Sequence, residues 1–197
     1  MVSIKSEAGT TYQQKLQSSI QTLRSKTNVQ DQSTAFYKVM TDSVFPSWMG
    51  TKWDFNGVSN VPGQGQIACG YFVSTTLKHV GFNLNRYKMA QQAASVIINI
   101  LCENSKKHEK YQSELIQQLK SAGNNKLYVV GLDYHVGFLA VENNQVYFIH
   151  SDYYLGKVVC EVAADSKSFW DSNSYIYGEL TNNSQLLNKW KNGTKIY

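Results

Sequence analysis

GQGQIACGYFV, residues 63–73, is the stretch that organises the chain, because a glycine-rich run there leads directly into a cysteine and an apolar segment. The next residues repeat at spacings of three and four, which is typical of one buried face of an α-helix: Phe72, Val73, Thr76, Leu77 and Val80. Cys69 is therefore expected in the first turn of that helix, where unpaired N–H groups and the positive end of the helix dipole favour an anion. A thiol in such a place has its pKa lowered toward that of a reactive thiolate, so we interpret Cys69 as a nucleophile.

Length and composition indicate a single globular domain over residues 1–197. Hydrophobic residues make up 42% of the chain and aromatic residues 13%, which argues against a disordered protein. The formal net charge is +5, but the basic residues are scattered and form no basic helix, so no nucleic-acid partner is expected. No run approaches the roughly 18 apolar residues of a membrane span. We expect a monomer without a membrane span.

Hydrophobic spacing predicts a helical first half and a strand-rich second half. Helices are predicted over residues 10–26, 31–44, 69–79, 87–101 and 109–121, with Pro46 breaking the second one. Strands are predicted over residues 127–132, 135–141, 145–150, 157–162 and 174–179, and short helices over 165–170 and 184–190. Asn143-Asn144 predicts a tight hairpin turn. The result is an α+β fold, with the Cys69 helix packed on an antiparallel sheet.

Three cysteines, Cys69, Cys102 and Cys160, do not make a disulfide framework. Cys102 ends an apolar helical run and Cys160 lies in an apolar strand, so we expect both to be small buried groups. A bond between these two is the alternative. No short-spaced pair such as C-x-x-C or H-x-x-x-H occurs, so neither a metal site nor a cofactor is expected.

Four histidines are candidates for the base that a nucleophilic cysteine needs. His79 is ten positions along the same helix, about 15 Å from Cys69, and His108 lies in a charged run that is most simply a solvated face. His135 opens one predicted strand and His150 closes the next, so antiparallel pairing places the two imidazoles side by side at one edge of the sheet. The alternative is that both are ordinary surface residues at strand ends.

Two further roles are needed, a group that orients the imidazole and donors for an oxyanion. Asp133 and Asp152 are rival orienting groups, since each is two residues from a candidate histidine and so on the same strand face. The N–H of Cys69 is a natural oxyanion donor. Gln66 or Gln64 could add a side-chain amide and Trp53 an indole N–H, although solvation of the glutamines and core packing of Trp53 are equally acceptable interpretations.

Several short segments together resemble the NlpC/P60 cell-wall peptidases, a family of papain-like cysteine hydrolases. The family pattern reads D-C-S-G-F-V, then G-x-x-L-P-R with a Gln a few residues on, then H-V-G-I-Y and a terminal I-H. This chain has CGYFV (69–73), GFNLNR (81–86) with Gln91-Gln92, HVGFL (135–139) and FIHS (148–151). The match covers residues 53–152. Ala68 replaces the family's Asp, Gly70-Tyr71 replaces Ser-Gly, and the spacing between the two histidines is longer than usual, which affects substrate preference more than chemistry.

The resemblance implies a papain-like fold with its core over residues 53–197, preceded by an N-terminal helical extension over residues 1–52 to which no role is assigned. It implies Cys69 as nucleophile, His135 as base and His150 as the orienting third residue. Trp53 then stands near the oxyanion, and Gln66 and Asp152 are candidate substrate-binding groups. Members of the family cleave amide bonds in peptidoglycan stem peptides, so the implied partner is a cell-wall peptide.

Two other functions remain open. The chain could be a non-catalytic module that binds cell wall or glycan, for which exposed aromatic residues such as Trp48, Trp53, Tyr153 and Tyr154 are suited. It could also be a secreted antibacterial amidase toxin. The start, MVSIK, lacks the apolar core of a signal peptide. Either the protein is cytosolic as made or a leader has been removed, and the implied periplasmic or extracellular location assumes the second.

Overall fold

A six-stranded antiparallel sheet lies at the centre of the computed structural model, which describes residues 8–26, 28–102 and 106–197. The strands lie in the order β1-β6-β2-β3-β4-β5. Their bounds are β1 Lys106–Glu109, β2 Lys126–Gly131, β3 Val136–Glu142, β4 Gln145–Asp152, β5 Lys157–Val162 and β6 Tyr175–Glu179. The predicted α+β class is confirmed, and each of the five predicted strands is present with its bounds moved by two residues at most.

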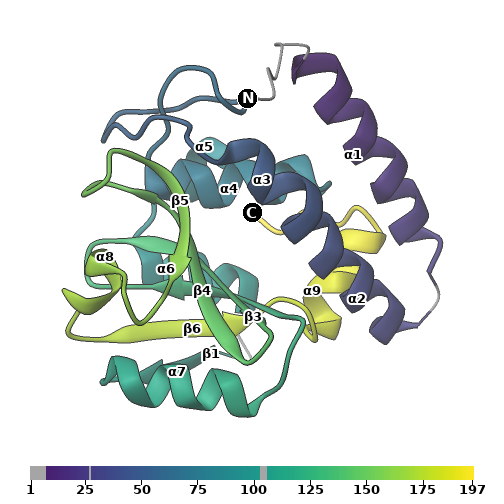
Figure 1. Cartoon of the computed structure of the whole chain (residues 1–197). Coiled ribbons are helices and arrows are strands. Elements are labelled where there is room, and N and C mark those ends of the chain that lie inside the picture. The colour runs from purple at the N-terminus through teal and green to yellow at the C-terminus, as the bar shows by residue number, and fades with distance from the viewer. Residues whose placement is uncertain (1–7, 27, 103–105) are drawn as a thin grey trace.

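Helices cover both faces of this sheet, which is why its central strands are almost continuously apolar. Along β2, Leu127 and Val129 join one core cluster, and the alternate residues Tyr128 and Val130 join the other. The first cluster is completed by α1 (Ala8–Arg24), α2 (Val29–Val39), α4 (Cys69–His79), α6 (Ala94–Cys102) and α9 (Ser184–Lys191). The second is covered by α7 (Gln112–Ser121) and α8 (Lys167–Trp170). Figure 1 shows α7 beneath the sheet, away from α1 and α2.

The hairpin between β3 and β4 confirms the turn predicted at Asn143-Asn144. Both residues have positive φ, 50° and 59°, as a two-residue turn matched to the strand twist requires. Asn124 supports the turn, since its side-chain oxygen accepts the N–H of Asn144 at 2.8 Å. This turn sets the register of the pair, in which Phe138 faces Ile149, and the register in turn decides which side chains of β4 lie near the start of β3.

Pro46 does not break the second predicted helix, so that prediction was wrong. After α2 the chain continues through a π-helical segment, Met40–Val44, into α3 (Phe45–Trp48). The wide turn lets the N–H of Phe45 donate to the carbonyl of Met40. Pro46 then falls in the first turn of α3, where a missing N–H costs little. As a result Trp48 is fully buried and packs edge-on against Phe72 of α4, so the expectation that it is an exposed aromatic residue was wrong.

Two other helix predictions need correction. The helix predicted over residues 87–101 is two helices, α5 (Arg86–Ala90) and α6, separated at residues 91–93. The helix predicted from residue 109 begins at Gln112, because residues 106–109 form the edge strand β1 and pair with β6. A charged edge strand resists pairing with another chain, which accounts for the lysines in this run. His108 is exposed on it.

The segment between α3 and α4 has few regular elements but is held firmly. The N–H of Ile67 donates to the carbonyl of Lys52 at 2.9 Å, and the N–H of Trp53 donates to the carbonyl of Gly156 at 2.8 Å. Gly57 is required here, since a Cβ on it would lie 2.5 Å from the backbone nitrogen of Ile67. The segment thereby fixes the chain immediately before Cys69, as expected of an ordered loop rather than a linker.

The three cysteines form no disulfide within the described part of the chain. Cys102 is buried as predicted, but Cys160 is exposed, so the prediction of burial was wrong for Cys160. The reason is that β5 is an edge strand of the sheet. None of the helices in the described ranges is both long enough and apolar enough to cross a membrane.

Candidate active site

Cys69 is the first residue of α4, preceded by Ala68 in extended conformation. Backbone N–H groups of Cys69, Gly70 and Val136 hydrogen-bond the sulfur and favour the thiolate. Burial has the larger effect, however, and raises the pKa of the Cys69 thiol above its usual value. The predicted position of Cys69 is confirmed, whereas the predicted lowering of its pKa was wrong. The helix start packs on β3 and leaves Cys69 only partly exposed, so desolvation outweighs the helix dipole.

Gly70 allows α4 and α5 to approach each other closely. A Cβ at this position would lie 2.4 Å from the carbonyl oxygen of Ala90, the last residue of α5. The helix ends there, and the chain leaves through Gln91 and Gln92 before α6 begins. This helix break, which the sequence pattern does not predict, places Gln91 and Gln92 on the wall of the same cavity as Cys69.

His135 and His150 lie side by side, as predicted. Nε2 of His135 and Nδ1 of His150 are 2.8 Å apart, and the two rings meet edge to face. His135 follows the turn after β2, which is closed by a hydrogen bond from the N–H of Leu132 to the carbonyl of His135 at 2.8 Å. Both residues are buried, 4% and 0% exposed. Burial, reinforced by His150, holds the pKa of His135 well below its usual value, so this imidazole is neutral.

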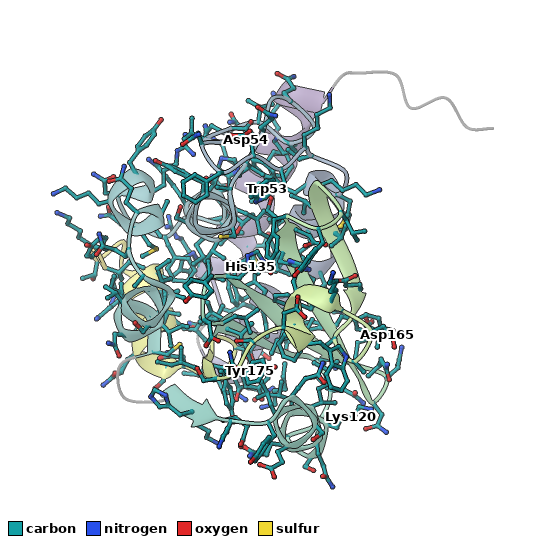
Figure 2. The ribbon with its side chains drawn as sticks, turned by 90° about the vertical axis from the view of Figure 1, so that its left-hand side faces the viewer. Trp53, Asp54, Lys120, His135, Asp165 and Tyr175 are labelled. Carbon is teal, nitrogen blue, oxygen red and sulfur yellow. The ribbon has the colours of Figure 1, made fainter. Side chains whose placement is uncertain are left out.

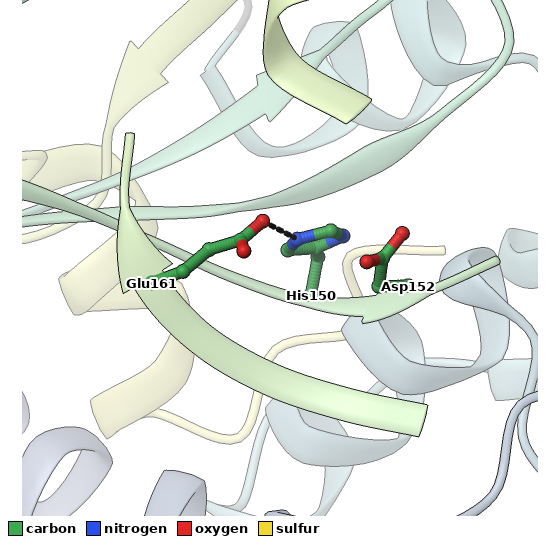
Figure 3. A group of neighbouring side chains, drawn as sticks. All are labelled: His150, Asp152 and Glu161. Carbon is green, nitrogen blue, oxygen red and sulfur yellow. Dashed lines mark hydrogen bonds and ion pairs between the residues drawn. The ribbon is translucent and has the colours of Figure 1, made fainter. Parts of the chain in front are cut away.

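Glu161 of β5, which is not among the residues predicted from the sequence, extends the pair to three hydrogen-bonded side chains. Its Oε1 lies 3.1 Å from Nε2 of His150 (Figure 3), and this hydrogen bond is the largest cause that holds the pKa of Glu161 below its usual value. The carboxylate accepts the Nε2 proton of His150. Nδ1 of His150 then accepts a hydrogen bond from Nε2 of His135. The carboxylate of Glu161 thereby fixes the tautomer of His135 through His150.

The signal for Glu161 was present in the sequence but needed the strand register. It is the one acidic residue in the run KVVCEV, residues 157–162. In the structure β4 and β5 pair so that Val159 faces His150 and Glu161 faces Phe148. Glu161 is thus the diagonal neighbour of His150 on the same face of the sheet. This register depends on the turn over residues 153–156 and on backbone contacts of β5 with residues 50–53, such as the N–H of Val158 donating to the carbonyl of Thr51 at 2.8 Å.

Cys69 and His135 line one cavity of about 440 Å³. Trp53 lines it as well and lies above His135 on the same side of the molecule (Figure 2). Because Nε2 of His135 is engaged by His150, Nδ1 is the ring nitrogen left for the cavity, and it hydrogen-bonds to none of the described residues. Among these residues no hydrogen bond joins the Cys69 sulfur to the His135 ring. The two side chains share a cavity but are not in hydrogen-bond contact.

The other predicted site residues lie outside this cavity. Gln66 is exposed in the preceding loop and, with Gln64, lines a separate hollow. Asp152 is buried and accepts from Ser168 Oγ at 2.6 Å and from the N–H of Tyr154 at 3.0 Å, so it supports the turn after β4. Asp133 accepts from residues 173 and 174 before β6. Neither carboxylate hydrogen-bonds His135 or His150 in the described chain.

One group of side chains has donor atoms suited to a metal ion. Ligand atoms of His150, Asp152 and Glu161 all lie within 4.8 Å of one another. Imidazole and carboxylate groups of this kind bind divalent transition metals. Each donor already has a protein partner, however: His150 uses both ring nitrogens, and Asp152 accepts from Ser168 and the turn backbone. Metal binding here would break the contact between His150 and Glu161.

His79 has a structural environment rather than a place beside the cysteine. Its ring nitrogens lie 3.3 Å from the Tyr12 hydroxyl and 3.3 Å from Oδ1 of Asn60. Burial, together with Arg86 and Lys78, lowers the pKa of His79 to about 4. It links α1 to α4 as a neutral ring.

Comparison with known proteins adds no identification. Neither protein-family models, nor curated proteins, nor solved structures gave a match to this chain. What stands is the class that the fold and site define: an α+β protein whose cavity holds a cysteine at a helix N-terminus and a neutral histidine backed by His150 and Glu161.

Proposed function

We propose that this protein is a cysteine hydrolase that cleaves amide bonds in bacterial peptidoglycan stem peptides. The observation that supports this most is that Cys69 and His135 line one cavity. Nε2 of His135, the ring nitrogen on the side away from the cavity, lies 2.8 Å from Nδ1 of His150. A nucleophile, a base and an orienting group are the parts that this chemistry needs. We extend the set by Glu161, which fixes His150.

The hydrogen-bond chain determines which atom acts as the base. Glu161 keeps the proton of His150 on Nε2, so Nδ1 of His150 accepts the Nε2 proton of His135. The lone pair of His135 is then on Nδ1. When the Cys69 sulfur attacks the amide carbonyl carbon, the thiol proton passes to this Nδ1.

The remaining steps return the site to its starting state. His135 gives that proton to the amide nitrogen, the C–N bond breaks, and the amine leaves behind a thioester on Cys69. Water then attacks the thioester carbonyl carbon as His135 takes one of its protons. The C–S bond breaks, the acid product leaves, and His135 returns the proton to the sulfur, which restores the thiol of Cys69. The N–H of Cys69 is an oxyanion donor, and the indole of Trp53 is a second candidate on the cavity wall.

The two pKa shifts fit a pair that is neutral at rest. Burial raises the pKa of Cys69 and lowers that of His135, so thiol and imidazole are both uncharged near neutral pH. Proton transfer accompanies attack on the substrate instead of preceding it. A rapidly alkylated thiolate is therefore not expected in the free protein.

The family resemblance gives the substrate class. The segments similar to NlpC/P60 peptidases supply Cys69, His135 and His150, and an α4 packed against β3 and β4 agrees with a papain-like arrangement. Activity on cell-wall peptides requires a periplasmic or extracellular location. The N-terminal extension contains α1 and α2, which share one apolar core with α4. These two helices therefore stabilise the position of α4.

The test is digestion of purified peptidoglycan fragments, read by mass spectrometry. The native chain should release products split at a stem-peptide amide, and Cys69→Ala should release none. Cys160→Ala is the matched control, because it removes an exposed thiol on the edge strand β5 and should leave the products unchanged. Equal cleavage by native chain and Cys69→Ala would overturn the assignment of the nucleophile.

A non-catalytic wall-binding module is the second candidate. It is favoured by the raised pKa of Cys69 and by the lack of a hydrogen bond from its sulfur to His135 in the described residues. Phe55 and Tyr134, 80% and 98% exposed on the cavity rim, are also suited to binding. A module of this kind would bind peptidoglycan fragments and release no products.

A further inference from the structure

The cavity that holds Cys69 and His135 carries no formal charge on its walls. None of the described residues that line it is Asp, Glu, Lys or Arg, and burial keeps His135 neutral. The carboxylate of Asp54, next to Trp53, accepts the N–H of Asn56 at 2.8 Å. Arg86 lies 5.6 Å from the ring centroid of the wall residue Tyr71, on the side of a different cavity, and its guanidinium donates to Thr75 Oγ1 at 2.9 Å and to the carbonyl of Val58 at 2.9 Å.

Aromatic rings form much of the wall instead. Trp53 and Tyr153 lie with centroids 6.3 Å apart, and Tyr153 meets His135 at 5.5 Å. Phe55 and Tyr134 stand at the rim, exposed to solvent. Exposed rings gathered at a cavity mark a surface that buries apolar parts of a ligand.

Three of the polar side chains on the wall are carboxamides, beside the hydroxyls of its tyrosines and the indole of Trp53. Asn56, Gln91 and Gln92 all line the cavity. Gln92 donates to the carbonyl of Lys88 at 3.0 Å, which leaves its oxygen available. The side chain of Gln91 is exposed and hydrogen-bonds to no other residue in the described ranges. Such groups donate to and accept from another carboxamide equally well.

From this combination we infer that the site is selective for amidated stem peptides, in which the residue beside the scissile bond carries a neutral carboxamide in place of a carboxylate. The inference rests on the proposed hydrolase function and names its substrate class. A carboxylate entering this cavity would lose water without meeting a cation, which is costly. A carboxamide in the same position can pair with Gln91 or Gln92 at no such cost.

Two synthetic stem peptides that differ only in this carboxamide or carboxylate provide the test. The native protein should cleave the carboxamide peptide with a kcat/KM about tenfold or more above that of its carboxylate twin. The inactive Cys69→Ala protein should also bind the carboxamide peptide more tightly in a calorimetric titration. Gln91→Arg, which adds a cation to the cavity wall, should reduce or reverse both preferences. Gln117→Arg is the matched control, since it adds the same charge on exposed α7 and should preserve them.

The outcomes separate this inference from the proposed function. Cleavage of both peptides at equal rates, or faster cleavage of the carboxylate peptide, would overturn the inference and leave the hydrolase intact. Failure to cleave either peptide, with a retained binding preference for the carboxamide in native and Cys69→Ala proteins, would overturn hydrolysis and keep the selectivity of the cavity. Equal binding without cleavage would overturn both.

Discussion

The ring of His150 stacks on the ring of Phe148, with centroids 3.9 Å apart and planes 16° from parallel. The two residues are alternate positions on β4 and so share a face of the sheet. Stacking fixes the plane of the His150 ring, and hydrogen bonds to His135 and Glu161 fix its rotation. The ring of His150 is therefore held rigidly. The effect of Glu161 on the tautomer of His135, which passes through His150, can be measured.

Replacing Glu161 tests this link. Glu161→Leu removes the acceptor for Nε2 of His150 and should lower kcat roughly 10- to 100-fold, since a hydrogen bond to a charged group contributes about 1.5–3 kcal/mol. Glu161→Gln keeps an oxygen acceptor and should retain most of the activity. The nitrogen chemical shifts of both histidine rings report the tautomers directly. Unchanged shifts in Glu161→Leu would contradict a tautomer-setting role for Glu161.

Replacing Gly70 tests the close approach of α4 and α5. Gly70→Ala places a Cβ 2.4 Å from the backbone carbonyl of Ala90, which no side-chain rotation can relieve. We expect a loss of about 2–4 kcal/mol in the free energy of unfolding, measured by denaturant titration. Gly193→Ala is the control: it has φ of 64° with nothing within 4 Å, so it measures backbone strain alone, about 1 kcal/mol. Equal losses in the two variants would rule out the predicted clash.

His79 should make the fold sensitive to acid. Its pKa is lowered to about 4 in the folded protein and is about 6.5 unfolded. Between these values the unfolded state binds more protons, so the stability due to a neutral His79 is complete above about pH 6.5. It is lost as the pH falls toward 4. Allowing for partial exposure, the loss is on the order of 2 kcal/mol.

The measurement is the free energy of unfolding at pH 7 and at pH 5, compared between the native chain and His79→Gln. The variant should show the smaller difference between the two pH values. His135, whose pKa is also lowered, remains in both proteins and cancels in the comparison. An identical pH dependence in the two proteins would show that His79 is not the buried neutral group described above.

The neutral resting state predicts how Cys69 reacts with iodoacetamide. In a Cys160→Ser background, which removes the exposed thiol, alkylation of Cys69 should be slow at pH 6 and should rise with a midpoint above the usual thiol pKa. Peptide mapping identifies the modified residue. Rapid alkylation at pH 6 would instead indicate a thiolate–imidazolium pair, and the mechanism would then begin from charged groups.

Local patterns in the sequence predicted the parts of the site that lie on single elements. The apolar spacing after Cys69 predicted α4, and Asn143-Asn144 predicted the hairpin that joins the strands of His135 and His150. What the sequence could not predict depends on contacts between elements. The helix break after Ala90 lies where the Ala90 carbonyl approaches Gly70 of α4, and the raised pKa of Cys69 arises from burial.

Register accounts for the remaining differences. Asp152 and Asp133 are rival candidates for the orienting group because each is two residues from a histidine, but Asp152 accepts from Ser168 of α8 and Asp133 accepts from Ser174. Glu161, on a different strand, reaches His150 because β5 pairs with β4 at Val159. A diagonal partner of this kind can be identified only once the alignment of the strands is known.

The central claim, that the Cys69 sulfur forms a covalent intermediate with the substrate acyl group, is tested most directly by intact-protein mass spectrometry of acid-quenched mixtures with amidated stem peptides. We predict a transient mass increase equal to the acyl fragment, which proteolytic mapping places on the peptide containing Cys69 and which is absent in Cys69→Ala. Product formation without any adduct, at equal rates in the native protein and in Cys69→Ala, would contradict the account.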